Sequence, residues 1–285
     1  MKVLIGIVSK NRKSILPKAI DSALSQTYKN KEVWVFDDNS SDGTVELQWK
    51  YPMVKWIFSS ESLGYVYARN LFMKQPGFDF FCSLDDDSWF IEVDALEMGI
   101  EYMINNTNVG ALGYDMLTPE NPESKSTKLI FRETNSFIGC GHIINLIAAK
   151  QVGYYILNPG FYGGEEKDLS IRMYNVGFKI VEYVNKYVWH DKTAIARNLP
   201  LQHRSGVCND MVFTWRRTPF IYLIPSLIIK TYKHLRFSIT FKKQSLFKPF
   251  ILGMIDFYKW LIIKKTNRNP VRVEGFKKYL NANKV

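Results

Sequence analysis

Three consecutive carboxylates, Asp85, Asp86 and Asp87, are the side chains of this sequence that most suggest metal chemistry. They follow directly after residues 80–84, five uncharged and mostly apolar residues that are typical of a buried strand. Carboxylates this close repel one another, and a divalent cation placed between them and a phosphate would relieve that repulsion. Oxygen ligands of this kind favour Mg²⁺ or Mn²⁺. A solvated acidic loop is the alternative, although open α/β sheets bind their ligands at the carboxyl ends of strands.

A second group of acids stands at the predicted start of a helix. A pair of glycines precedes residues 165–176, which are expected to be helical, and Gly177 is the predicted stop. Glu165, Glu166 and Asp168 fall in the first turn of this helix. Acids at such positions complement the helix dipole, which is one interpretation. A carboxylate that reaches a substrate hydroxyl can instead act as a general base.

The elements that must position these residues alternate along the first half of the chain. Apolar positions repeat with helical spacing over about residues 15–26, and a second helix is expected to carry residues 68–70. The runs that are predicted to form strands are residues 3–8, 32–36, 54–58 and 80–84. This alternation predicts an α/β fold with a mainly parallel sheet and helices on both faces.

The composition indicates a folded protein from a reducing compartment. Hydrophobic residues make up 46% and aromatic residues 15% of the 285 residues, which excludes a disordered chain. Cys82, Cys140 and Cys208 are far apart and lack CxxC spacing, so neither a disulfide framework nor a zinc site is expected. The apolar run at the N-terminus is too short and too lightly charged for a signal peptide, and we expect a buried strand there.

The charge is unevenly distributed along the chain. Residues 216–285 carry 16 Lys plus Arg against two acids, a net charge of +14. Residues 1–215 carry 22 basic and 25 acidic side chains, a net charge of −3. This difference predicts a globular domain over residues 1–215, followed by a basic extension over residues 216–285 that has an anionic partner.

The basic extension is predicted to be helical and amphipathic. Its two apolar segments, residues 219–229 and 250–263, fall short of the ~20 apolar residues that a bilayer span needs. We therefore expect helices that lie peripherally on an anionic membrane, with Lys and Arg facing the headgroups. Packing on the globular domain or on a second subunit is the alternative. Nucleic acid is not an expected partner, because no nucleic-acid motif accompanies the charge.

Four motifs in residues 1–90 carry a resemblance to a known family. They occupy residues 8–12 (VSKNR), 37–44 (DDNSSDGT), 63–70 (LG followed by ARN) and 84–87 (LDDD). In this order and spacing they resemble the nucleotide-sugar half of the inverting family-two glycosyltransferases, which have the GT-A fold. The resemblance covers about residues 1–215. It implies a nucleotide-sugar half over residues 1–90 and an acceptor half over residues 91–215.

The resemblance also implies roles for residues on the donor side. Asp38 would bind the base of the nucleotide, with Ser9, Asn11 and Arg12 in the loop beside it. Arg69 would lie near the base or the diphosphate. The chemistry agrees, because a carboxylate can accept the imide N–H of uracil and a guanidinium suits phosphate. A turn residue at position 38 and a solvated helix residue at position 69 are the alternatives.

The acidic motif and a histidine complete the implied donor site. Asp85 would contact the ribose or the sugar, Asp86 would be a further donor-binding residue, and Asp87 would hold the metal ion. His190 ends an apolar strand, and the resemblance makes it a metal ligand or a diphosphate contact, although a histidine at a strand end can be merely structural. We expect the segment after His190, through residues 197–198 and 203–206, to form a loop that closes over the donor.

Residues 163–172 resemble the acceptor motif of the same family, which is commonly Glu-Asp-x-Asp followed by Leu and Arg. Glu166 stands where that motif has its catalytic Asp, so the carboxylate lies about one methylene further out. Because a base must reach the acceptor hydroxyl, Asp168 or Glu165 could carry the role instead.

The function implied by the resemblance is that of a metal-dependent inverting glycosyltransferase. It would move a sugar from UDP or dTDP to a hydroxyl of a glycan or lipid-linked acceptor, in the cytoplasm at the inner face of the cell membrane. A sugar nucleotidyltransferase is one alternative, but residues 9–13 lack the glycine-rich triphosphate loop that it needs. A membrane-docked scaffold with a decayed site is the other, and only Glu166 in place of Asp supports it.

Overall fold

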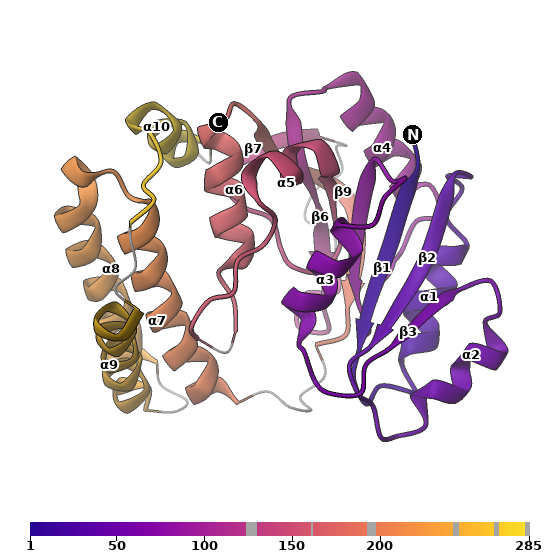
Figure 1. Ribbon diagram of the computed structural model, residues 1–285, viewed down its shortest axis with the longest axis horizontal. Coiled ribbons are helices and arrows are strands. Elements are labelled where there is room, and N and C mark those ends of the chain that lie inside the picture. The colour runs from indigo at the N-terminus through magenta and orange to yellow at the C-terminus, as the bar shows by residue number, and fades with distance from the viewer. Residues whose placement is uncertain (124–129, 161, 193–197, 242–244, 265–267, 283–285) are drawn as a thin grey trace.

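A mixed sheet organises the structure, a computed structural model that describes residues 1–123, 130–160, 162–192, 198–241, 245–264 and 268–282 (Figure 1). Within these residues nine strands follow the order β3-β2-β1-β4-β8-β6-β9-β5, and β7 pairs with β9. The strands are β1 (Val3–Ser9), β2 (Lys31–Asp37), β3 (Lys55–Phe58), β4 (Phe80–Asp85), β5 (Ser88–Phe90), β6 (Val109–Leu117), β7 (Ile130–Thr134), β8 (His142–Asn145) and β9 (Lys179–His190).

The register of the sheet brings strand ends together. β1, β2, β3 and β4 are parallel, so Ser9 lies opposite Asp37, and Val8 lies opposite Asp85. β8 is antiparallel to both β4 and β6. β5 runs antiparallel to β9, which sets Ser88 opposite His190. The acidic motif after β4 and the end of β9 therefore meet at one place, although a hundred residues separate them in the sequence.

Helices cover both faces of the sheet (Figure 1). On one face α1 buries Leu16, Ala19, Ile20 and Ala23, an apolar stripe at helical spacing. On the other face α3 contributes Phe72 to a separate core. These helices and their neighbours are α1 (Leu16–Leu24), α2 (Leu47–Lys50), α3 (Tyr65–Met73), α4 (Ala95–Asn105), α5 (Leu146–Val152) and α6 (Glu165–Asn175), with a 3₁₀ turn, η1 (Thr44–Glu46), before α2. The predicted α/β architecture is confirmed.

The remaining helices are α7 (Leu199–Arg217), α8 (Phe220–Thr240), α9 (Phe247–Lys264) and α10 (Val273–Asn281). α7, α8 and α9 stand together at the opposite end of the molecule from β3 (Figure 1). Met211 and Phe257 join α7 to α9 in a small core of their own. α10 returns to α6, where Phe276 and Tyr279 share a core with Leu169. The proposed boundary after residue 215 thus falls inside α7. Among the described residues, no helix combines the length and the apolarity needed to cross a membrane.

The prediction of a loop from after His190 to Gly206 was wrong for residues 199–206, which form the first half of α7. Residues 193–197 lie outside the described residues. Asn198 caps the helix by accepting a hydrogen bond from the Leu201 amide at 3.0 Å, and Pro200 occupies the first turn. Both residues favour a helix start. These two residues determine the local structure more strongly than Gly206, the only residue that suggested a loop.

Candidate functional site

A cavity of about 570 Å³ opens where β1 and β2 end and α3 begins. Its walls include Ser9, Asp38, Gly64 and Glu165. Ser9 is only 1% exposed, and its hydroxyl finds no hydrogen-bond partner among the described residues. A buried hydroxyl without a partner is costly, and Ser9 is one of the residues that line this cavity.

Asp38 anchors the loop at the mouth of this cavity. Its carboxylate accepts hydrogen bonds from the Ser62 hydroxyl at 2.7 Å and from the Leu63 and Gly64 amides at 2.6 and 3.1 Å. The side chain is buried. The predicted contact with a nucleotide base therefore has to be made by a carboxylate that already holds the loop before α3.

The loop after β1 is tied to its neighbours through the residues predicted beside the base. Asn11, in a left-handed conformation with φ 55°, accepts a hydrogen bond from the Ser41 amide at 2.7 Å. Asp86 accepts one from the Lys10 amide at 3.2 Å and lies 3.9 Å from the Arg12 guanidinium. Burial, followed by the charges of the adjacent aspartates, raises the pKa of Asp86 to about 7.

Asp87 and His190 lie together, as the resemblance implied. Asp87 Oδ1 is 3.3 Å from His190 Nε2, because the pairing of β5 with β9 sets Ser88 against His190. Two neighbouring ligands of an octahedral ion at about 2.1 Å are themselves about 3 Å apart. Carboxylate oxygen and imidazole nitrogen are also donors that suit Mn²⁺. The residues present therefore fit a divalent ion.

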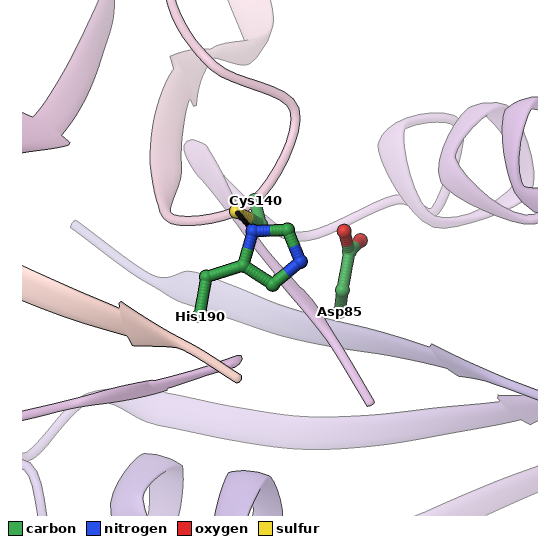
Figure 2. A group of neighbouring side chains, drawn as sticks. All are labelled: Asp85, Cys140 and His190. Carbon is green, nitrogen blue, oxygen red and sulfur yellow. Dashed lines mark hydrogen bonds between the residues drawn. The ribbon is translucent and has the colours of Figure 1, made fainter. Parts of the chain in front are cut away.

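Cys140 also belongs to the group of side chains around His190, and the sequence did not reveal this. Its sulfur, the nearest oxygen of Asp85 and a ring nitrogen of His190 lie within 4.8 Å of one another (Figure 2). Burial raises the pKa of the Cys140 thiol well above its usual value. The glycine on either side was the only sequence signal. A Cβ on Gly141 would lie 2.6 Å from the Val188 side chain, so the loop can press against β9 only because this residue is glycine.

Arg69 connects Asp85 to the two glutamates at the start of α6. The guanidinium is 2% exposed and donates to Asp85 Oδ1 at 2.7 Å. Its Nη1 lies 3.4 Å from Glu166 Oε1 and 3.9 Å from Glu165 Oε1. Burial lowers the pKa of Arg69, but the neighbouring carboxylates, Asp85 foremost, outweigh it and raise the pKa overall. Arg69 is thus a buried bridge between carboxylates rather than a solvated helix residue.

Two neighbouring glutamates of α6 line two different cavities. Glu165 lines the first, and Glu166 lines a second of about 430 Å³ whose other walls include Tyr162, Gln202 and His234. Burial, together with the charge of Glu165, raises the pKa of the Glu166 carboxyl group well above its ordinary value. A carboxyl group with a raised pKa beside a cavity is suited to general base chemistry.

Gly139 leaves room for the Glu166 carboxylate. A Cβ at position 139 would lie 2.4 Å from Glu166 Oε1 and 3.3 Å from Arg69 Nη1. Glycine at position 139 thus provides the space needed by the acidic side chain from α6.

Asp168 lies away from both cavities. It is 1% exposed, and its carboxylate accepts hydrogen bonds from Arg172 Nε and Arg217 Nε, each at 2.6 Å. An interior carboxylate held by two guanidinium groups cannot reach a substrate hydroxyl. Between Glu166 and Asp168, the geometry therefore favours Glu166 as the base.

Comparisons of the sequence with known proteins point to one class of enzyme. The family model described as "Glycosyl transferase family 2" matches residues 4–148. The chain is 35% identical over 107 residues to the UDP-Glc:alpha-D-GlcNAc-diphosphoundecaprenol beta-1,3-glucosyltransferase WfgD of Escherichia coli. It is 33% identical over 109 residues to an uncharacterized glycosyltransferase of Haemophilus influenzae. Each match covers 36% of this chain and only 42% and 43%, respectively, of these relatives.

Solved structures share the fold at much lower identity. TarS 1-349 of S. aureus in complex with UDP-GlcNAc superimposes with a TM-score of 0.66 at 17% identity, over 91% of this chain and 81% of that one. The mannosyltransferase PcManGT of Pyrobaculum calidifontis, in complex with GDP-Man and Mn²⁺, gives 0.62 at 11% identity, over 92% and 75%. At these identities, the similarities show that the fold is shared and nothing more.

Proposed function

The chain belongs to glycosyl transferase family 2, and from this premise we propose that it is an inverting glycosyltransferase that uses a divalent metal ion. The match to the family model spans about half of the chain. The family and the GT-A fold implied by the sequence motifs are confirmed. In the proposed reaction a sugar passes from a nucleoside diphosphate to an acceptor hydroxyl, with inversion at the anomeric carbon.

One observation carries this proposal: the two cavities meet at the start of α6. Gly163 borders both, Glu165 lines the first, and Glu166 lines the second. A donor in the first cavity and an acceptor in the second would face each other across Glu166. Holding two reactants in line supplies a large part of the rate of a group transfer.

On the donor side, Ser9 and the loop held by Asp38 would bind the nucleotide. Asp87 and His190 would hold the metal ion, which when bound stabilises the charge that develops on the departing diphosphate. UDP is the nucleotide we favour, because WfgD is named for UDP-Glc and TarS was solved with UDP-GlcNAc. Arg69 would keep Asp85 oriented toward the sugar through their 2.7 Å ion pair.

On the acceptor side, Glu166 would accept the proton of the attacking hydroxyl. The second cavity offers polar walls, including Gln202, Asp210 and His234, for the hydroxyl groups of a glycan. WfgD is named for an acceptor sugar linked to diphosphoundecaprenol. We propose a glycan or lipid-linked acceptor for this chain as well.

We also propose peripheral contact of residues 216–285 with the inner face of the cell membrane. α8 and α9 expose large apolar side chains, for example Ile224, Ile228 and Ile262 at 62%, 64% and 73%. The net charge of +14 over the same extension favours a surface with anionic lipids.

Thermal unfolding with a panel of nucleotide sugars tests the proposed donor and metal together. A UDP-sugar should raise the melting temperature in Mn²⁺ and raise it much less in chelator, because a ligand of the folded state stabilises it. Asp87→Ala should keep the unliganded melting temperature, lose the Mn²⁺-dependent rise and abolish sugar transfer. If no nucleotide sugar moves the transition, or if Asp87→Ala transfers sugar undiminished, the proposal fails. Measured transfer would also separate an enzyme from a decayed scaffold.

A further inference from the structure

The two ring nitrogens of His190 face different partners. Nδ1 lies 3.4 Å from the sulfur of Cys140, and Nε2 lies 3.3 Å from Asp87 Oδ1. Figure 2 shows the Cys140 sulfur against one edge of the ring, with the second nitrogen on the side of Asp85. Asp87 and the thiol therefore approach different nitrogens of a single imidazole.

Only one nitrogen of a neutral imidazole has a free lone pair for a metal ion. If Nε2 is to bind a cation beside Asp87, Nδ1 must carry the proton. Histidines that bind metals almost always donate this second N–H to a fixed acceptor, and the acceptor sets the tautomer and the ring orientation. In this structure the atom in the acceptor's place is Cys140 Sγ.

Cys140 is poorly placed to be a metal ligand itself. Its sulfur approaches Nδ1, whereas Asp87 approaches Nε2, and one ion cannot lie in front of both ring nitrogens. Mn²⁺ and Mg²⁺ also prefer oxygen ligands to sulfur. The thiol can therefore act on the cation only through the imidazole.

The loop that carries Cys140 is fixed on both sides. The Gly141 amide donates to the Ser83 carbonyl of β4 at 2.9 Å, and Gly141 packs against Val188 of β9. Cys140 itself is 2% exposed. A rigid, buried acceptor next to the last residue of β9 can hold the His190 ring in one orientation.

We propose that Cys140 is a positioning residue for His190: its sulfur accepts the Nδ1–H and leaves Nε2 free to bind the cation with Asp87. This role rests on the proposed metal-dependent function. It assigns to Cys140 neither metal binding nor contact with the reacting atoms.

Titration of Mn²⁺ in the presence of UDP, with free Mn²⁺ followed by electron paramagnetic resonance, tests this role without turnover. Cys140→Ala should weaken Mn²⁺ binding by about tenfold or more, as other losses of the partner of a metal-binding histidine do. Cys140→Ser should restore most of the affinity, because its hydroxyl can again accept the N–H. Cys208→Ala, which removes a cysteine equally buried in α7, should bind Mn²⁺ as the unaltered chain does. Melting without metal reports whether each variant folds.

Three results would overturn the role. Equal Mn²⁺ affinity of Cys140→Ala and the unaltered chain, while Asp87→Ala binds weakly, would reject the positioning role and leave the metal site standing. A thiolate-to-cobalt charge-transfer band in the Co²⁺ form, lost in Cys140→Ser, would make Cys140 a ligand instead. Absence of Mn²⁺ binding by the unaltered chain would reject the metal and this role together.

Discussion

At the scale of single residues, the surroundings of the Glu166 carboxyl group shift its pKa in the direction that suits the proposed general base. Burial and the charge of Glu165 both favour its protonated form and raise its pKa, and the Arg69 guanidinium opposes them only in part. An ordinary glutamate titrates near pH ~4.3. Glu166 therefore holds its proton to a higher pH, and its base form increases as the pH rises through the raised pKa.

The pH profile of kcat should show this residue directly. We expect the acid limb well above the range of an ordinary glutamate, with activity rising as Glu166 loses its proton. Glu166→Gln should reduce kcat by about 10²–10⁴, the usual contribution of a general base. Glu165→Gln should move the limb to lower pH, because it removes a negative charge that raises the pKa of Glu166. A limb that stays in place in Glu165→Gln would contradict this coupling.

Gly139→Ala tests whether the space around Glu166 matters. The added Cβ would meet Glu166 Oε1 at 2.4 Å, closer than any real contact, so the carboxylate must move. Displacements of about an ångström at reacting groups can cost about a hundredfold in rate. We expect at least that loss in kcat, with Mn²⁺ and UDP still raising the melting temperature. Full activity would mean that the carboxylate position is not critical.

Part of the site could be predicted from residue types, and part could not. The family resemblance of the sequence motifs predicted that Asp87 and His190 share a site, and the structure places the two side chains 3.3 Å apart. The bridging role of Arg69 and the contact of Cys140 with His190 depend on side chains that approach from distant loops. No local pattern records such approaches, so these two roles needed the folded chain.

At the scale of elements, Asp168 ties α6 to the C-terminal helices. Its carboxylate on α6 pairs with Arg172 of α6 and Arg217 of α7. The Arg172 guanidinium also donates to the Tyr154 carbonyl after α5, and Arg217 donates to the Asn269 carbonyl before α10. One buried carboxylate thus organises four segments behind the second cavity.

Asp168→Asn should therefore act on stability. Removing the charge leaves two buried guanidinium groups without their counter-ion, and breaking a buried pair from one side costs about 3–5 kcal/mol. Urea denaturation should show a loss of this size, with the pH dependence of kcat unaltered in whatever fraction remains folded. Glu274→Gln, which breaks an exposed pair with Lys278, is the matched control and should change little. Loss of activity without loss of stability would return Asp168 to the list of candidate bases.

Element prediction succeeded where apolar runs are short and regular. The first four predicted strands correspond to β1, β2, β3 and β4. Pro225 lies inside α8, which continues through it from Phe220 to Thr240. A proline in the second turn of a helix removes one backbone hydrogen bond, and the remaining residues propagate the helix past it. From the sequence alone, such a proline predicts a helix break. The sequence does not show that the rest of the helix compensates for the lost hydrogen bond.

At the scale of the whole molecule, charge and apolar exposure divide the chain in the same way. Residues 1–215 are close to neutral and supply most of the walls of both cavities, with His234 of α8 added to the second, whereas the extension is strongly basic. Large apolar side chains that are more than half exposed cluster on two of its helices: Phe220, Ile221, Ile224, Ile228, Ile229, Tyr232 and Ile239 on α8, and Tyr258, Ile262 and Ile263 on α9. The charge can be read from the sequence. The exposed apolar face can be identified only from the structure, because it depends on how α7, α9 and α10 pack.

Flotation with lipid vesicles tests this surface. The chain should bind vesicles that contain phosphatidylglycerol and bind pure phosphatidylcholine weakly, because basic residues near an anionic surface each contribute about 1 kcal/mol. Binding should fall as salt rises from 0.1 to 1 M, where the screening length shrinks from about 10 to about 3 Å. Ile224→Ser with Ile228→Ser, one helical turn apart on α8, should weaken binding further, since inserted apolar area adds to the electrostatic attraction. Trp49→Ser, which removes an 81% exposed side chain of α2, is the matched control and should bind as before. Equal binding to both lipids would reject the anionic surface, and a concentration-dependent dimer that the α8 double substitution dissociates would identify a second copy of the chain as the partner of this face.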